Sequence, residues 1–137
     1  MKVQVERIGI KYGMDATNEY GSKVKMDCTA TNGVNAVGSS PMELLLMAVA
    51  GCSSIDVEII LTKMKQEFIK LRVEVEGTKT KVDNHSIFSE IHLHYSLEGA
   101  VAPEKLEKAI DMSLGTYCSV AKILGSSAKI TSSFTII

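Results

Sequence analysis

The stretch that decides the fold is Ser40–Lys65, SPMELLLMAVAGCSSIDVEIILTKMK. Its first residues carry the signs of a helix start, because Ser40 can cap a helix, Pro41 suits the first helical position and Glu43 completes a capping box. Residues 44–52 contain no charged side chain, so this part of the helix must be covered on every side. We therefore predict one long buried helix, about 36 Å in length at 1.5 Å per residue.

The composition excludes several classes of protein. With 45% hydrophobic and 23% charged residues, the chain is expected to be globular and folded. Its net charge is −1 and it has no basic run, which argues against a nucleic-acid partner. The N-terminus alternates polar and apolar residues, and no uninterrupted apolar run reaches about 18 residues, so we expect a cytoplasmic protein without a membrane partner. The length predicts a single domain, residues 1–137.

Alternating hydrophobicity predicts the strands. The expected strands are Val3–Lys11, Ser22–Ala30, Phe68–Thr78, Ile87–Leu97 and Ala128–Ile136. Gly13–Gly21 and the polar segment 79–86 are expected to be hairpin ends, and 31–40 is expected to be a loop. The order of elements predicts an α+β fold with an antiparallel sheet.

Two further helices are predicted near the C-terminus. Pro103 begins one helix, which Gly115 is expected to end. Thr116 is expected to cap a second, short helix that Gly125 stops. A long helix that is apolar on all faces needs more cover than one sheet face gives, which favours an intimate homodimer.

The three cysteines do not suggest a disulfide framework, because the count is odd and there is no C-x-x-C pair. Cys52 is either a small core residue or a reactive thiol in an apolar setting. Cys118 lies two residues after the expected cap Thr116, where the helix dipole favours the thiolate. Cys28 lies among apolar neighbours on an expected strand and is interpreted as a core or spectator residue.

Other polar residues on these elements have simpler interpretations. Glu43 lies about 13 Å from Cys52 along the helix axis and on a different face, so the capping box explains it. Asp56 shares the face of Cys52 and is expected to make a hydrogen bond or a dimer contact. His92 and His94 share a strand face and could bind a metal, but no third ligand is near in sequence. We therefore expect a solvated strand face, no metal site and no cofactor.

Three segments together resemble the OsmC/Ohr family of thiol-dependent proteins: residues 40–65, IFSEIHLHYSLEG and AIDMSLGTYCSVAKIL. The chain is most similar to a small OsmC-like branch of that family. The resemblance implies an α+β fold in which antiparallel sheets pack on two long central helices of an intertwined homodimer. It also implies that Cys52 is a peroxidatic cysteine that attacks an organic hydroperoxide, that Cys118 resolves the sulfenic acid, and that a dithiol is the reductant.

Two positions differ from the pattern of the family's peroxidases. Those proteins have Glu directly after the motif's proline, whereas this chain has Met42 there and Glu43 one position later. They also carry an Arg in an N-terminal Gly-rich turn, and Gly13–Gly21 contains none, so that Arg7 and Lys11 are the nearest substitutes. The resemblance therefore implies reduction of organic hydroperoxides, at a low rate unless another group activates Cys52. The alternative is a non-enzymatic redox sensor, or a protein that binds a small apolar ligand.

Overall fold

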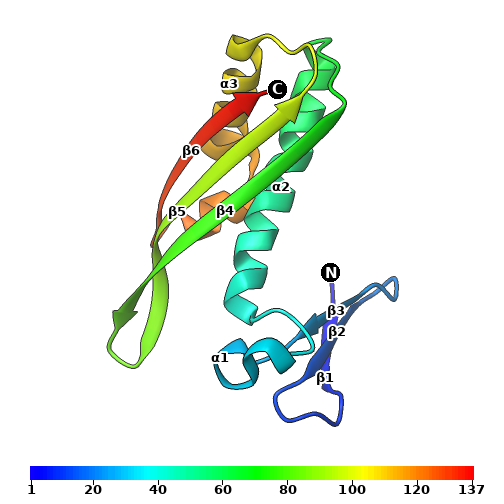
Figure 1. The fold of residues 1–137 in the computed structure, drawn as a ribbon, viewed down its shortest axis with the longest axis vertical. Coiled ribbons are helices and arrows are strands. Elements are labelled where there is room, and N and C mark those ends of the chain that lie inside the picture. Colours follow the sequence, from blue (N-terminus) through cyan, green and yellow to red (C-terminus); the bar gives the residue numbers. More distant parts are fainter. The chain divides into compact units, whose positions relative to one another are not determined.

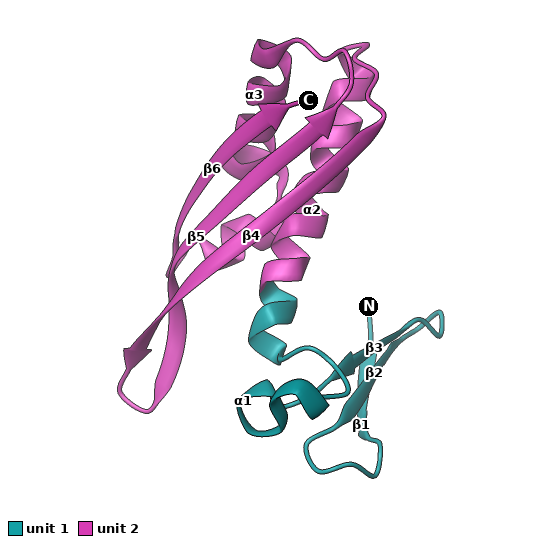
Figure 2. Cartoon of the chain, viewed as in Figure 1, with its two compact units in different colours: residues 1–45 teal, residues 46–137 magenta.

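The computed structural model describes all residues, 1–137. Contacts divide the chain into two compact units, residues 1–45 and 46–137 (Figure 2). The single domain over 1–137 stays a prediction.

The N-terminal unit contains an antiparallel sheet in the order β1-β2-β3. Its strands are β1 (Val3–Arg7), β2 (Met14–Asn18) and β3 (Lys23–Met26). The prediction that Gly13–Gly21 is only a hairpin end was wrong, because β2 occupies its middle. The glycines mark the two turns on either side of a short strand whose residues alternate too weakly to be recognised.

One face of this sheet is apolar. Val5, Ala16 and Val24 lie directly opposite one another across the three strands, and both valines are about half exposed in the single chain. Arg7 shares this face, since it lies two residues after Val5 on β1. The other face is polar, and its Asp15 forms ion pairs there with lysines of β3.

A compact turn region follows β3. It contains α1 (Thr29–Asn32) and a 3-10 turn (Gly33–Asn35), where the sequence predicted only a loop. Its centre is the carboxylate of Asp27, which is 3% exposed. That carboxylate accepts hydrogen bonds from the backbone N–H groups of Val37 and Cys28 and from the Asn32 amide, at 2.9, 2.6 and 2.7 Å. These donors, with Val37 first, lower the pKa of Asp27.

The long helix α2 (Pro41–Lys63) begins as predicted. The Ser40 N–H donates to Glu43 Oε2 at 2.7 Å, and the Glu43 N–H donates to Ser40 Oγ at 3.2 Å, which confirms the capping box. The helix ends two residues before the predicted position. Lys65 has a positive φ of 55°, the left-handed conformation that commonly follows a helix end.

The C-terminal unit contains the second sheet, in the order β4-β5-β6. Its strands are β4 (Lys70–Val82), β5 (His85–Glu98) and β6 (Lys129–Ile136). β4 and β5 form a long antiparallel hairpin, whereas β6 pairs with β5 in parallel. The antiparallel expectation therefore holds for every strand pair but the last. The last connection contains the helices α3 (Pro103–Met112) and α4 (Ser119–Leu124), and a crossover of this length can return the chain in the parallel direction.

The core of this unit lies between the sheet and its helices, which lie along one face of the sheet (Figure 1). Alternate residues of β5 point into that core and are fully buried, as the pattern of the strand predicts. The buried side chains of β5, α2 and α3 include Leu93, Tyr95, Leu97, Val57, Leu61, Leu106 and Ile110. The opposite face of β5 carries His92 and His94.

By length and composition alone, α2 could cross a membrane. Its apolar residues nevertheless divide into two sets. Val49, Val57 and Leu61 are fully buried within the chain, whereas Ile55 and Ile59 are 61% and 47% exposed. The buried set is typical of the core helix of a globular protein. The exposed set forms an apolar stripe along α2.

Candidate functional site

The position of Cys118 depends on an unusual turn after α3. Residues Ser113–Tyr117 form a π-helical turn, in which the Cys118 N–H bonds to the Ser113 carbonyl at 2.8 Å. Cys118 itself then caps α4, because its Sγ accepts from the Ala121 N–H at 3.4 Å. The predictions that Gly115 ends the helix and that Thr116 caps the next were therefore wrong. The chain continues through Gly115 as a wider turn, and this turn directs both Ser113 and Cys118 toward α2.

The two thiols predicted to act together are brought together. The sulfurs of Cys52 and Cys118 and a carboxylate oxygen of Asp56 all lie within 4.8 Å of one another. Cys118 is fully buried, and the other two residues are half-buried. Asp56 joins the group because residues four apart share a helix face. Glu43 is not part of this group, because its side chain accepts a hydrogen bond from the Ser40 N–H at the start of α2.

A chain of hydroxyl groups holds the Asp56 carboxylate from the buried side. Ser113 Oγ donates to Asp56 Oδ2 at 3.0 Å and is hydrogen-bonded to Ser53 Oγ at 2.9 Å. Ser53 Oγ in turn lies 2.5 Å from the hydroxyl oxygen of Tyr95, on the inner face of the sheet. Asp56 thus makes the hydrogen bond that its sequence position predicts. The other three residues, Ser113, Ser53 and Tyr95, were not predicted, because their only signal in the sequence is a hydroxyl group at an otherwise apolar position.

Burial dominates the electrostatics of this cluster. It raises the pKa of Cys118 to about 11, and the neighbouring Cys52 thiol and the Asp56 charge act in the same direction. The Ala121 N–H opposes them only in part. The expectation that a helix start favours the Cys118 thiolate was therefore wrong, because α4 has only six residues and the thiol is desolvated. Burial likewise raises the pKa of Tyr95 to about 12.

The third thiol lies in a different environment. Cys28 belongs to the N-terminal unit, is half-buried, and its Sγ lies 3.3 Å from Thr31 Oγ1. The hydrogen bonds from the Thr31 side chain and backbone lower the pKa of Cys28. Cys28 lies at the start of α1, two residues after the end of β3, so the expectation that it is a strand residue was wrong, and it is the one cysteine of the N-terminal unit.

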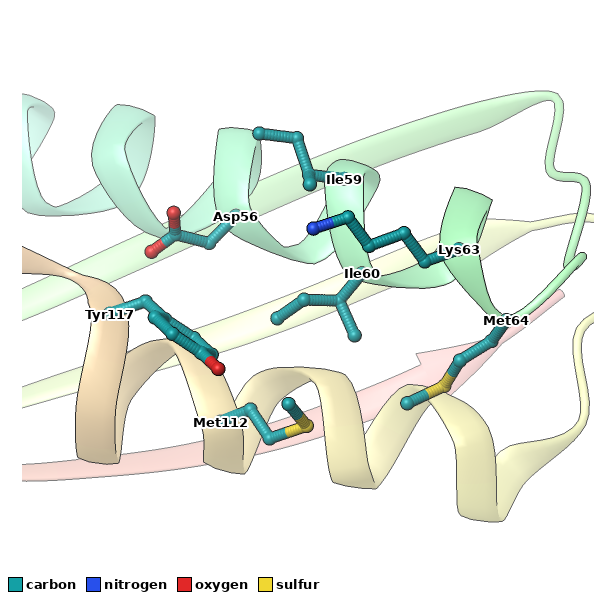
Figure 3. A pocket seen from close by; sticks show the side chains of 7 residues that line it. All are labelled: Asp56, Ile59, Ile60, Lys63, Met64, Met112 and Tyr117. Atoms are coloured by element: carbon teal, nitrogen blue, oxygen red, sulfur yellow. The ribbon is translucent and has the colours of Figure 1, made fainter.

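An apolar pocket of about 450 Å³ opens beside the cluster (Figure 3). It is lined by Asp56, Ile59, Ile60, Lys63, Met64, Met112 and Tyr117. Figure 3 shows the Lys63 side chain running along α2 toward Asp56, with the Tyr117 ring across from them. The pocket therefore offers a mostly apolar lining with one carboxylate and one ammonium group, and Asp56 connects it to the thiols.

The histidine pair on the outer face of β5 is occupied by hydroxyl partners. His92 Nδ1 lies 2.7 Å from Thr131 Oγ1, and His92 Nε2 lies 2.9 Å from Ser133 Oγ. His94 Nδ1 lies 2.8 Å from Ser133 Oγ as well, and His94 Nε2 lies 3.3 Å from Thr135 Oγ1. All four ring nitrogens thus have partners on β6. The two histidines therefore lie in a row of polar side chains shared by β5 and β6, and their interpretation as a solvated strand face stays a prediction.

Fold and site together define an α+β protein that places two thiols between a long apolar helix and a capped short helix. A comparison with known families assigns residues 32–133 to the family described as OsmC-like protein. The chain belongs to the OsmC family. The family named from the sequence segments is thereby confirmed.

Individual relatives agree with this assignment. Protein YhfA of Escherichia coli is 35% identical over 99 residues, which are 72% of this chain and 73% of YhfA. A crystal structure of an OsmC-like protein from Mycoplasma pneumoniae superposes with a TM-score of 0.84 at 20% identity, covering 99% of this chain and 96% of that one. The organic hydroperoxide resistance protein OhrB of Bacillus subtilis gives 0.74 at 14% identity, covering 98% and 96%. The last two likenesses show the fold.

Proposed function

We propose that this chain is a thiol-dependent peroxidase that reduces organic hydroperoxides through Cys52 and Cys118. The observation that carries the proposal is the approach of the two thiols, which lie within 4.8 Å together with Asp56. The family assignment supports the chemistry, since relatives of the same fold are named as organic hydroperoxide resistance proteins.

The proposed reaction begins at Cys52, which is the more accessible of the two thiols. Its thiolate attacks the outer oxygen of R–O–O–H, the O–O bond breaks, Cys52 becomes a sulfenic acid, and the alkoxide leaves as an alcohol after taking a proton. The Cys118 thiol then attacks the sulfenic sulfur and expels water as the disulfide forms. An external dithiol reduces that disulfide. The apolar pocket beside Asp56 suits the organic group of the peroxide better than it suits hydrogen peroxide.

The rate of the first step is expected to be low. The chain has Met42 where the family's peroxidases have Glu, and Gly13–Gly21 contains no arginine, so neither activating group of the family stands at its usual position. Arg7 and Lys11, the nearest substitutes for the family's arginine, belong to the N-terminal unit. Their participation at Cys52 stays a prediction.

The test is stopped-flow consumption of cumene hydroperoxide with excess dithiothreitol. We expect Cys52→Ser to reduce the rate by at least about 100-fold, since the remaining thiol of the cluster, Cys118, is fully buried. In a separate experiment without dithiothreitol, Cys118→Ser should consume one equivalent of peroxide and then stop at the sulfenic acid, which dimedone would label. Cys28→Ser is the matched control and should leave the rate unchanged. A wild-type rate equal to that of free dithiothreitol, and unaffected by Cys52→Ser, would overturn the proposal.

The pocket favours a second candidate function, in which the protein holds a small apolar ligand or senses oxidation without turnover. A cavity of about 450 Å³ lined by isoleucine and methionine side chains is large enough for such a ligand. Native mass spectrometry of the freshly purified protein distinguishes the two functions. A retained ligand, together with no catalysed peroxide consumption, would favour this second candidate.

We also propose that the working form is a homodimer, because α2 leaves an apolar stripe uncovered in the single chain. Ala48, Ile55 and Ile59 are exposed along one side of the helix, with the half-buried Cys52 between them. A second copy of the chain is the occupant that the family's usual assembly suggests. Ile55→Glu should convert the dimer to monomers in sedimentation experiments, whereas Glu58→Gln on the same helix should not.

A further inference from the structure

The cluster of Cys52, Asp56 and Cys118 has the composition of a metal site as well as that of a redox pair. Two thiolates and a carboxylate are ligands that zinc accepts, and zinc sites with three protein ligands keep a fourth position open. Zinc–sulfur and zinc–oxygen bonds of about 2.3 and 2.0 Å place tetrahedral ligand atoms about 3.5–3.8 Å apart. The donor atoms here already lie within 4.8 Å, so a contraction of about 1 Å would be enough. We propose that Cys52, Asp56 and Cys118 bind a zinc ion.

The hydrogen bonds around the cluster support this geometry. The Ala121 N–H donates to the sulfur of Cys118, and the hydroxyl of Ser113 donates to Oδ2 of Asp56. Partners of this kind orient the ligands of metal sites and raise metal affinity. Ser113 is itself held through Ser53 and Tyr95, so the support reaches into the core of the unit.

The charges of the cluster also favour a bound metal cation. Two thiolates and a carboxylate would place three negative charges within 4.8 Å of one another when all three groups are deprotonated. A bound dication would compensate this accumulation of negative charge, because a coordinating thiol loses its proton to the solvent when the metal binds. The sequence alone gave no reason to expect a metal, since Cys118 lies 62 positions after Asp56 and no C-x-x-C is present.

Metal binding would also connect the site to peroxide chemistry. With zinc bound, one lone pair of each thiolate would be engaged in a zinc–sulfur bond, which would lower the nucleophilicity of both sulfurs and slow their attack on a peroxide. When an organic hydroperoxide does oxidise the site, the two thiolates give up two electrons and form the disulfide, and the peroxide takes two protons to give alcohol and water. The zinc ion, having lost two of its three ligands, is released. The release of zinc on oxidation rests on the proposed function, whereas zinc binding itself does not.

The test uses cobalt(II) as a spectroscopic probe for the zinc site, titrated into reduced protein without oxygen. We expect one cobalt per chain, thiolate-to-cobalt charge-transfer absorption and loss of that absorption on adding zinc. Cys52→Ser and Cys118→Ser should each abolish the absorption, and Ser113→Ala should weaken binding on the order of tenfold. Cys28→Ser is the control and should leave the titration unchanged. Absent charge-transfer bands, or bands that survive loss of either cluster thiol, would overturn the proposal.

A second measurement on the wild-type chain avoids variants that fail to fold. Zinc should slow alkylation of Cys52 at least tenfold while leaving Cys28 unaffected, as read from peptides by mass spectrometry. Equal rates with and without zinc would contradict the site. Both measurements are made without peroxide, so their failure is distinguishable from failure of the peroxidase activity. Zinc binding without any peroxide reduction would support this inference and contradict the proposed function.

Discussion

The chain contains two thiol–aspartate neighbourhoods whose local electrostatics are opposite. In the N-terminal unit, three N–H groups compensate the Asp27 carboxylate, and the Cys28 thiol beside it has a lowered pKa. In the C-terminal unit, Asp56 adds to the burial that raises the pKa of Cys118. The difference indicates that the pKa of a thiol depends less on the presence of a nearby carboxylate than on two other factors. These are the hydrogen-bond donors that compensate the carboxylate and the extent to which the thiol is desolvated. Cys28, whose pKa is lowered, is the one thiol of its unit, whereas Cys118, whose pKa is raised, lies beside a second thiol.

The largest expected effect is on alkylation by iodoacetamide. At pH 8 a thiol with a pKa of about 11 is only about 0.1% thiolate, so Cys118 should react at least ~100-fold more slowly than Cys28. Peptide-resolved mass spectrometry of the reduced protein over a time course measures both rates in one sample. Cys28→Ser removes the fast phase and serves as the control. Comparable alkylation rates for Cys28 and Cys118 would contradict the opposite pKa shifts of these two thiols.

The next effect concerns folding stability. Ser113→Ala removes the hydroxyl that both Ser53 and Asp56 contact, and leaving buried polar groups short of a partner should cost about 2–3 kcal/mol. Thr31→Ala removes the partner of Cys28 in the other neighbourhood, where water can replace it, and should cost less than about 1 kcal/mol. Urea unfolding of the two variants beside wild type gives both values. Equal losses would mean that the C-terminal hydroxyl chain adds little to stability.

The two neighbourhoods should also respond to opposite ends of the pH scale. The lowered pKa of Asp27 means that its stabilising effect is present at neutral pH and is lost as the pH falls below about 3.8 and through the folded-state pKa. The raised pKa of Tyr95 means that its effect is present below pH 10 and is lost as the pH rises toward 12. The unfolding free energies of wild type and Tyr95→Phe should therefore converge by about 1–2 kcal/mol between pH 9 and pH 11.5. A difference that does not change with pH would contradict the buried, neutral phenol.

Local sequence signals predicted the parts of the molecule that depend on neighbouring residues. The start of α2 follows from Ser40, Pro41 and Glu43 alone, and the buried alternation of β5 follows from its own pattern. The pairing of Cys52 with Cys118 came from the family resemblance, because no local rule relates residues 66 positions apart. The structure now places these two thiols together independently of that resemblance.

The features that were missed depend on distant partners or on rare backbone geometry. The parallel pairing of β6 depends on where the crossover of helices returns the chain, which the strand's own residues do not specify. The π turn at Ser113–Tyr117 looks like a helix break, because glycine at position 115 ordinarily ends a helix. The contact of Ser113 with Asp56 joins residues 57 positions apart, so its role in the site could not be predicted from either residue.

The smallest expected effect tests the carboxylates directly. Asp56→Asn removes a charge that opposes the Cys118 thiolate but ranks below burial, so alkylation of Cys118 should accelerate only about 2–5-fold. Asp27→Asn is the matched change in the other neighbourhood, where the N–H donors already compensate the charge, and it should accelerate Cys28 less than about 2-fold. Rates measured at pH 8 by peptide mass spectrometry compare the two variants. If Asp27→Asn accelerated its thiol more than Asp56→Asn does, compensation by hydrogen bonds would not be what separates the two sites.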